Sequence, residues 1–139
     1  MGQSRNCGMT TVETSDTKTV CLVDDDPLVL TSLERLLLAY GFSVRSFNNP
    51  KSFLAHVQAH PVPLVVLDIW MDEMSGFEVQ ARLSALSPST SVIIMTGRKD
   101  PSVKLAVSHF GVVAFFTKPF DNGQFLSAMH GALAMHFVQ

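Results

Sequence analysis

The stretch Leu64-Val65-Val66-Leu67-Asp68 decides the fold, because it is an unbroken apolar run that ends in a carboxylate. A short run of Leu and Val that leads directly into a loop is typical of a strand buried on both faces of a sheet. The loop that follows extends from Trp70 to Gly76. We therefore expect the strand to deliver Asp68 to the edge of the sheet, where open α/β folds carry their functional sites.

A second run near the start of the chain has the same form. Val20-Cys21-Leu22-Val23 is apolar and is followed by three acids, Asp24, Asp25 and Asp26. In a parallel sheet the carboxyl ends of both strands lie at one edge, so these acids are expected to converge on Asp68. Converging carboxylates repel one another unless a cation lies between them, and oxygen ligands suit Mg²⁺. The two runs predict a divalent-metal site with one carboxylate free for chemistry.

Short apolar runs and longer helical patterns alternate along the rest of the chain. We expect five strands, at 18–23, around 44–47, and at 63–68, 91–95 and 112–116, each followed by a helix. The helices are expected to begin at Pro27, at Pro50, just after Gly76, at Pro101 and near Asp121, the last two ending near His109 and Phe137. Strands separated by helices require right-handed crossovers, which make the sheet parallel and cover both of its faces. The predicted fold class is α/β, a doubly wound (βα)5 five-stranded parallel sheet.

Local signals indicate where the helices begin and which faces they bury. Asp26 and Asn49 each precede a proline, and both residue types cap helices, while proline fits the first helical position. Gly41 is expected to end the first helix. The apolar residues expected on buried faces are Val29, Leu33, Leu36, Leu37 and Tyr40, then Phe53, Leu54 and Val57, then Phe77, Val79, Leu83 and Leu86.

Length and composition limit the functions that this segment can have. With 139 residues, 47% of them hydrophobic, the chain is expected to form one domain without disulfides or a structural metal. Its net charge of −2 gives no reason to expect direct contact with nucleic acid. We expect no membrane span and no signal peptide, because no apolar run is long enough, and we therefore expect a cytoplasmic location.

Composition also suggests where the domain begins. Residues 1–17 are polar and lack a hydrophobic period, which predicts a disordered lead-in containing Cys7. The domain itself is expected over residues 18–137, with no second domain after it. Cys21 lies within the first predicted strand, where a buried free thiol is the usual state.

Two further polar residues follow apolar runs at the expected sheet edge. Thr96 ends the fourth strand, and Lys118 follows the fifth. Together with the acids, they form a set suited to phosphoryl transfer to a carboxylate. In that chemistry the carboxylate attacks phosphorus, Mg²⁺ neutralises charge on the phosphoryl oxygens, and a lysine and a hydroxyl hold the remaining oxygens.

The chain resembles the response-regulator receiver domain, the phospho-acceptor module of two-component signalling, over about residues 18–137. The motifs that carry the resemblance are the acids after Cys21-Leu22-Val23, Leu67-Asp68-Ile69-Trp70-Met71 running to Gly76, Ile93-Ile94-Met95-Thr96-Gly97, and Phe116-Thr117-Lys118-Pro119-Phe120. The last two motifs look most like the FixJ-like branch, whose members usually carry a LuxR-type DNA-binding domain. The resemblance implies a CheY-like fold, also called flavodoxin-like, with strand order 2-1-3-4-5.

The resemblance also implies a role for each site residue. Asp68 corresponds to the phosphorylated aspartate, and the metal ligands correspond to Asp24, Asp25, Asp68 and the backbone carbonyl of Trp70. Thr96 would bond the phosphoryl group and Lys118 would neutralise it, after which Phe115 would pack inward as the aromatic switch. A cis peptide bond is expected before Pro119. The implied donor is a sensor histidine kinase, and the implied catalysis is limited to the domain's own phosphorylation and dephosphorylation.

Three positions depart from the family pattern. The family often has a proline where this chain has Asp72, and its loss is expected to loosen a loop that also gains Glu73. Trp70 lies two residues beyond the acceptor, where we expect it to shield the acyl phosphate from water. Phe110 adds apolar bulk before the fifth strand, on a face that could serve docking.

Two other functions compete with this interpretation. A phosphatase of the haloacid dehalogenase class would use Asp24 as nucleophile and Asp26 as general acid, but it leaves Asp68 without a role. A receiver fold that no longer takes phosphate would usually have lost the acceptor, an acid or the lysine, and all are present here. Whether the chain is a single-domain regulator or part of a longer transcription factor stays open. We expect phosphorylation-dependent homodimerisation through the face formed by about residues 100–137.

Overall fold

The computed structural model describes residues 19–97 and 112–137. Its strands are β1 (Thr19–Val23), β2 (Ser43–Phe47), β3 (Leu64–Asp68), β4 (Ser91–Thr96) and β5 (Ala114–Thr117). Its helices are α2 (Pro27–Ala39), α3 (Pro50–Ala59), α4 (Gly76–Leu86) and α6 (Asn122–Phe137). The predicted lead-in, the helix predicted from Pro101 to His109, and Phe110 lie outside the described residues.

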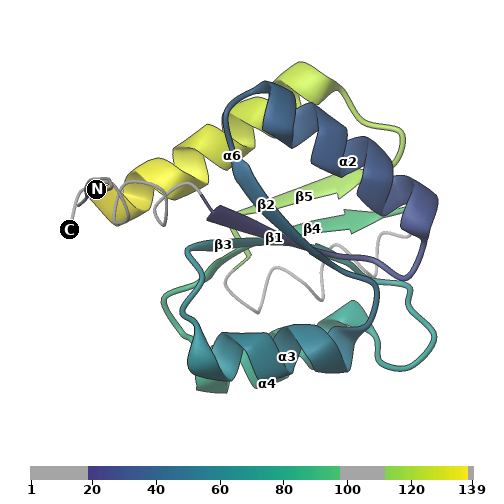
Figure 1. Cartoon of the computed structure of the whole chain (residues 1–139), viewed down its shortest axis with the longest axis vertical. Coiled ribbons are helices and arrows are strands. Elements are labelled where there is room, and N and C mark those ends of the chain that lie inside the picture. Colours follow the sequence, from purple (N-terminus) through teal and green to yellow (C-terminus); the bar gives the residue numbers. More distant parts are fainter. Residues whose placement is uncertain (1–18, 98–111, 138–139) are drawn as a thin grey trace, which may run out of the picture.

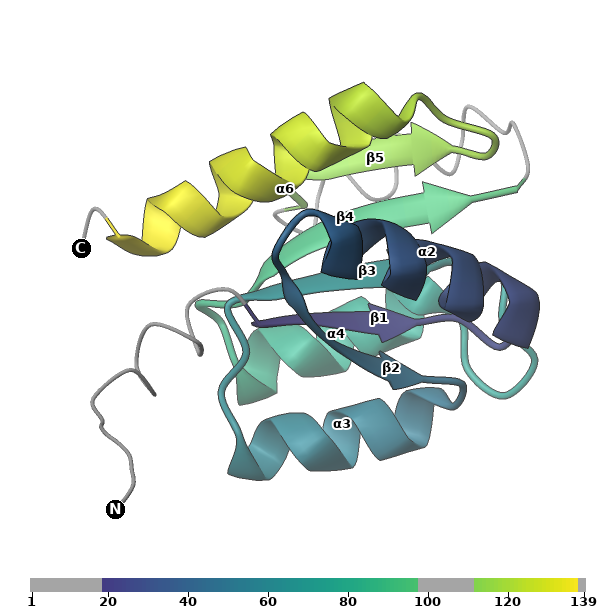
Figure 2. The same ribbon diagram turned by 45° about the horizontal axis from the view of Figure 1, so that its top comes forward.

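The five strands form one parallel sheet in the order β2-β1-β3-β4-β5, and this confirms the predicted fold class. All carboxyl ends consequently lie at the same edge, as the aligned arrowheads in Figure 2 show. β3 is central and every residue of it is buried. Its neighbours β1 and β4 flank it on either side, so the chain segments after these strands meet beside Asp68.

Helices cover both faces of the sheet, with α2 and α6 on one face and α3 and α4 on the other (Figure 1). Strand side chains alternate between the two resulting cores, because successive residues of a strand point to opposite faces. In β1, Val20 and Leu22 pack with the α2/α6 core, whereas Cys21 and Val23 pack with the α3/α4 core. Each fully buried side chain of this size stabilises the fold by about 1.5–3 kcal/mol.

The helix starts predicted at Pro27 and Pro50 are confirmed. Asp26 caps α2, its side chain accepting a hydrogen bond from the Leu28 amide at 2.9 Å. Asn49 caps α3 by accepting from the amides of Lys51 and Ser52 at 2.8 and 3.2 Å. Gly41 follows α2 with a positive φ of 88°, a conformation that glycine adopts without steric cost.

Three local predictions were wrong. Tyr40 was expected on the buried face of the first helix, but it is 59% exposed, because α2 ends at Ala39 and Tyr40 lies beyond it. Leu30, which was not among the residues expected on that face, is buried in that helix. Leu86, the last residue of α4, is 40% exposed. β5 occupies 114–117 rather than 112–116, because its pairing with β4 begins at Ala114 opposite Ile93.

Two other predictions agree with the structure. Cys21 is a fully buried free thiol, and burial raises its pKa to about 12, so it stays protonated. Among the helices in the described ranges, none combines the length and apolar character that a membrane crossing requires.

Candidate functional site

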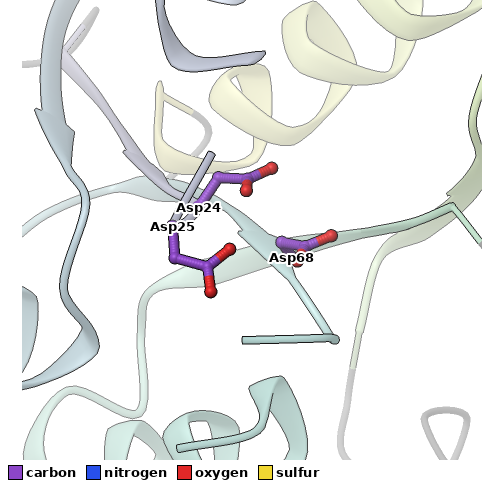
Figure 3. Close-up of side chains that lie close together, drawn as sticks. All are labelled: Asp24, Asp25 and Asp68. Atoms are coloured by element: carbon purple, nitrogen blue, oxygen red, sulfur yellow. The ribbon is translucent and has the colours of Figure 1, made fainter. Parts of the chain in front are cut away.

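Three carboxylates meet at the carboxyl edge of the sheet. Asp24 and Asp25 directly follow β1, and Asp68 ends the adjacent strand β3. One oxygen from each residue lies within 4.8 Å of the corresponding oxygens of the other two. Figure 3 shows the three side chains emerging from these two strand ends. Asp24 and Asp68 are buried and Asp25 is half-buried, so the cluster is largely withdrawn from water.

Lys118 bridges two of these carboxylates. Its Nζ lies 3.1 Å from Asp24 Oδ2 and 3.3 Å from Asp68 Oδ1. The backbone positions it, because the Lys118 amide donates to the carbonyl oxygen of Thr96 at 2.7 Å where β5 ends. The Lys118–Pro119 peptide bond is cis, as the resemblance implied. One ammonium group can balance only one of the three carboxylates, which leaves the site electronegative.

This imbalance changes the acid–base behaviour of the site. Burial, and then repulsion from Asp24 and Asp25, raise the pKa of Asp68 to about 6, although Lys118 opposes the shift. Burial alone would lower the pKa of Lys118, but attraction to Asp68 and Asp24 outweighs it and the net shift is upward. Asp68 therefore gives up its proton less readily than an ordinary aspartate, and any added cation would favour its ionised form.

The donor set fits a hard divalent cation such as Mg²⁺. Carboxylate oxygens are the protein ligands that this ion prefers, and the charge left over after Lys118 is the charge that an ion would balance. Asp24 and Asp25 are also oriented by backbone amides. Asp24 Oδ1 accepts from the Asp26 amide at 2.9 Å, and Asp25 Oδ2 accepts from the Asp72 amide at 3.1 Å.

The sequence predicted only that Gly76 precedes a helix. It did not reveal that this residue packs closely against the backbone of Asp68 and Ile69. Its amide donates to the Ile69 carbonyl at 2.8 Å. A Cβ at this position would lie 2.6 Å from the Asp68 carbonyl oxygen and 2.8 Å from Ile69 Cα. α4 can therefore start directly against the backbone of the strand that carries Asp68 only because residue 76 has no side chain.

The loop between Asp68 and Gly76 carries the other departures noted in the sequence. Trp70 is 37% exposed. The loop expected to be loosened by the absent proline is held by two hydrogen bonds, from the Asp72 amide to Asp25 and from Asn49 Nδ2 to Glu73 Oε1 at 2.9 Å. The side chains of Asp72 and Glu73 are exposed.

Thr96 and Phe115 lie on the strands beyond β3. Thr96 is fully buried at the end of β4, one residue past Met95, the register partner of Asp68. Phe115 is half-buried opposite Ile94 and packs against the α3/α4 core. The structure thus brings Asp24, Asp25, Asp68 and Lys118 into one cluster, and it places Thr96 and Phe115 on the adjoining strands.

Asp26, the general acid of the alternative phosphatase interpretation, is exposed and its side chain caps α2. The charged contacts at Asp68 join it to Lys118, Asp24 and Asp25 instead. This arrangement gives Asp68 the central place that the phosphatase interpretation does not explain.

Comparison with known proteins agrees with this geometry. Residues 20–130 match the family model of the response regulator receiver domain. The response regulator protein TodT of Pseudomonas putida is 34% identical over 116 residues, which cover 84% of this chain and 51% of TodT. The transcriptional regulatory protein FixJ of Bradyrhizobium diazoefficiens is 29% identical over 114 residues, covering 82% of this chain and 56% of FixJ. The chain therefore spans about half the length of these relatives.

Solved structures show the same architecture. The crystal structure of FixJ-N superposes with a TM-score of 0.78 at 31% identity, covering 84% of this chain and 93% of that one. The beryllofluoride-activated NtrC4 receiver domain dimer gives a TM-score of 0.80 at 25% identity, covering 85% of this chain and 98% of that one. The chain belongs to the response regulator receiver domain family of two-component signalling.

Proposed function

We propose that this chain accepts a phosphoryl group from a sensor histidine kinase on Asp68, in a Mg²⁺-dependent reaction. The observation that best supports the proposal is the position of Lys118 Nζ, 3.3 Å from Asp68 and 3.1 Å from Asp24 within the carboxylate cluster. An acceptor carboxylate, a counter-charge and a group of metal-binding acids are the parts that phosphoryl transfer requires.

The transfer itself needs little beyond positioning. One Asp68 oxygen forms a bond to phosphorus as the bond from phosphorus to the donor's imidazole nitrogen breaks, and the electron pair remains on that nitrogen. Asp24, Asp25, Asp68 and the Trp70 carbonyl would hold Mg²⁺, which when bound neutralises charge on the phosphoryl oxygens. Lys118 binds another phosphoryl oxygen. Dephosphorylation is a separate step, in which water attacks phosphorus as the bond from phosphorus to the Asp68 oxygen breaks, so that the carboxylate is regenerated and inorganic phosphate is released.

Phosphorylation is proposed to shift a pre-existing equilibrium between two conformations. The Thr96 hydroxyl bonds the phosphoryl group in the active form, and Phe115 packs inward as Thr96 moves. The buried position of Thr96 at the end of β4 and the half-buried position of Phe115 on β5 support these roles. Phosphate favours the active form because its oxygens gain the Thr96 and Lys118 contacts there.

The output is proposed to be transcriptional regulation by a longer parent protein. FixJ is named a transcriptional regulatory protein and this chain covers 56% of its length, which supports this view. We propose residues 18–137 as the receiver domain and 1–17 as a lead-in. The NtrC4 receiver domain dimer supports phosphorylation-dependent homodimerisation. We assign it to residues 100–137, of which 100–111 lie outside the described residues.

Intact-mass measurement after incubation with Mg²⁺ and acetyl phosphate tests the acceptor. Wild type should gain the mass of one phosphoryl group, and both Asp68→Asn and EDTA should abolish the gain. An adduct that persists in Asp68→Asn contradicts the assignment of Asp68. Sedimentation with and without beryllofluoride tests the dimer, and identical profiles contradict it.

A further inference from the structure

We propose that the backbone amide of Asp72 is a positioning group for the metal site, which orients Asp25 before any ion binds. The inference rests on the proposed Mg²⁺ site. It concerns a hydrogen bond between residues 47 positions apart, from the Asp72 amide to Asp25 Oδ2 at 3.1 Å.

Among the three clustered acids, Asp25 is the one whose orientation depends most on a hydrogen bond of this kind. Asp24 and Asp68 are almost fully buried, and both are paired with Lys118. Asp25 is half-buried, so more of its rotamer freedom must be removed by hydrogen bonding. The Asp72 amide occupies one carboxylate oxygen and leaves the other for an ion. Hydrogen bonds of this kind orient a metal-binding carboxylate and strengthen metal binding.

The loop that supplies the amide is fixed by a second contact. Asn49 uses Oδ1 to cap α3, and its Nδ2 donates to Glu73 Oε1 at 2.9 Å. Adjacent loop residues are thus tied to the segments that follow β1 and β2. Because Trp70 belongs to the same short loop, the two contacts also restrict where its carbonyl can lie.

The donor is a main-chain N–H, so any residue except proline supplies it. Since the family often has a proline at this position, the contact is one that this chain gains, and it would strengthen metal binding rather than be required for it. The side chain of Asp72 is exposed and is not the acceptor or donor of this bond. The role of the amide and the role of the side-chain charge can therefore be tested separately, by two different substitutions of Asp72. Asp72→Pro removes the N–H, whereas Asp72→Asn keeps it and removes only the charge.

Mg²⁺ titration of ¹⁵N-labelled protein, followed by amide chemical shifts in 0.15 M salt, measures the affinity and shows whether each variant is folded. We expect Asp72→Pro to weaken binding about tenfold or more. Asp72→Asn should change it less than about threefold, because the lost charge is exposed and screened. If wild type binds Mg²⁺ and the two variants bind it with equal affinity, the role of the Asp72 amide is overturned, while the proposed Mg²⁺ site stands. A wild type that does not bind Mg²⁺ contradicts the proposed function itself.

A second measurement applies if Asp72→Pro does not fold. A carboxylate acceptor moves the resonance of a bonded amide proton downfield, so Asp25→Ala should move the Asp72 amide proton upfield. An unchanged resonance overturns the inference.

The Asn49 contact supplies a test with matched net charge. Asn49→Asp keeps an N-cap residue but loses the donor to Glu73, and should weaken Mg²⁺ binding despite its added negative charge. Combining it with Glu73→Gln restores both the hydrogen bond and the original net charge, and should restore the affinity. Failure of the double variant to recover affinity counts against the role assigned to the loop.

Discussion

The backbone of Asp68 lies so close to Gly76 that a Cβ at residue 76 would sit 2.6 Å from the Asp68 carbonyl oxygen. The atoms that this Cβ would meet belong to the main chain of Asp68 and Ile69, so no flexible side chain can move to relieve the contact. The position of Asp68 is therefore fixed by the start of α4 as well as by its own strand.

Gly76→Ala should consequently destabilise the protein by about 1–3 kcal/mol, the usual cost of forcing extra volume into a packed region. Gly131→Ala is the matched control, because Gly131 lies within α6 and a Cβ there would meet nothing within 4 Å. That control should stabilise the protein by about 0.5–1 kcal/mol through reduced backbone freedom. Urea unfolding measures both, and equal effects of the two substitutions would disprove the close-contact argument.

The pKa of Asp68 predicts how stability depends on pH. Its folded-state pKa of about 6 exceeds the ordinary value of 3.8, so between these values the folded protein binds more protons than the unfolded chain. Asp68 therefore contributes stability below about pH 4 that is lost as the pH rises through 6, on the order of 3 kcal/mol in total. Asp68→Asn cannot ionise and should become progressively more stable than wild type over this range.

Urea unfolding of wild type and Asp68→Asn at several pH values between 4 and 7.5, without divalent cations, measures this difference. A constant difference in unfolding free energy across that range would be inconsistent with a raised pKa at Asp68. Lys118→Ala is a second variant to measure. Because Lys118 lowers the pKa of Asp68, its removal should raise that pKa and move the pH-dependent loss of stability to higher pH.

Mg²⁺ should stabilise the folded protein at neutral pH, because the proposed site exists only where folding has assembled the carboxylate cluster. At ten times its dissociation constant the ion should add about 1.4 kcal/mol, which corresponds to a rise in Tm of roughly 3–6 °C. Differential scanning fluorimetry with and without EDTA measures the rise. Asp25→Asn should reduce it, and an unchanged rise in that variant would exclude Asp25 as a ligand.

Trp70 is expected to shield the acyl phosphate of Asp68 from water. It lies two residues beyond Asp68 and is 37% exposed, so its large ring is partly presented to solvent at the site loop. Trp70→Asn should accelerate loss of the phosphoryl group several-fold, measured by intact mass during a chase after acetyl phosphate is removed. Trp70→Phe retains a ring and should decay nearer the wild-type rate. Identical decay in all three proteins would rule out shielding.

The sequence was sufficient to predict features that depend on local pattern. The Asp26-Pro27 and Asn49-Pro50 pairs predicted two helix starts correctly, because capping involves only residues close in the chain. The apolar runs predicted the parallel sheet, and its shared edge brought Asp68 to the acids after β1. The family motifs supplied the strand order and the cis peptide bond before Pro119.

Features that depend on strand register or on where distant parts of the backbone meet could not be predicted from the sequence. The run from Val112 to Phe116 is apolar throughout, so only its register with β4 reveals that the strand begins at Ala114. The hydrogen bond from the Asp72 amide to Asp25 uses a main-chain donor that every non-proline residue has. The hydrogen bond between Lys118 and Asp24 joins residues 94 positions apart, and its existence depends on the folded sheet.

Neighbouring phenylalanines on β5 face different layers of the protein. Phe115 packs against the α3/α4 core, while Phe116 lies in an aromatic group with Phe120 and Phe125 beneath α6. A rotation of Phe115 would therefore leave the packing beneath α6 intact. The inward packing proposed for Phe115 would therefore affect the α3/α4 side of the sheet, while the contact of Phe116 with Phe125 keeps the opposite face of the strand attached to α6.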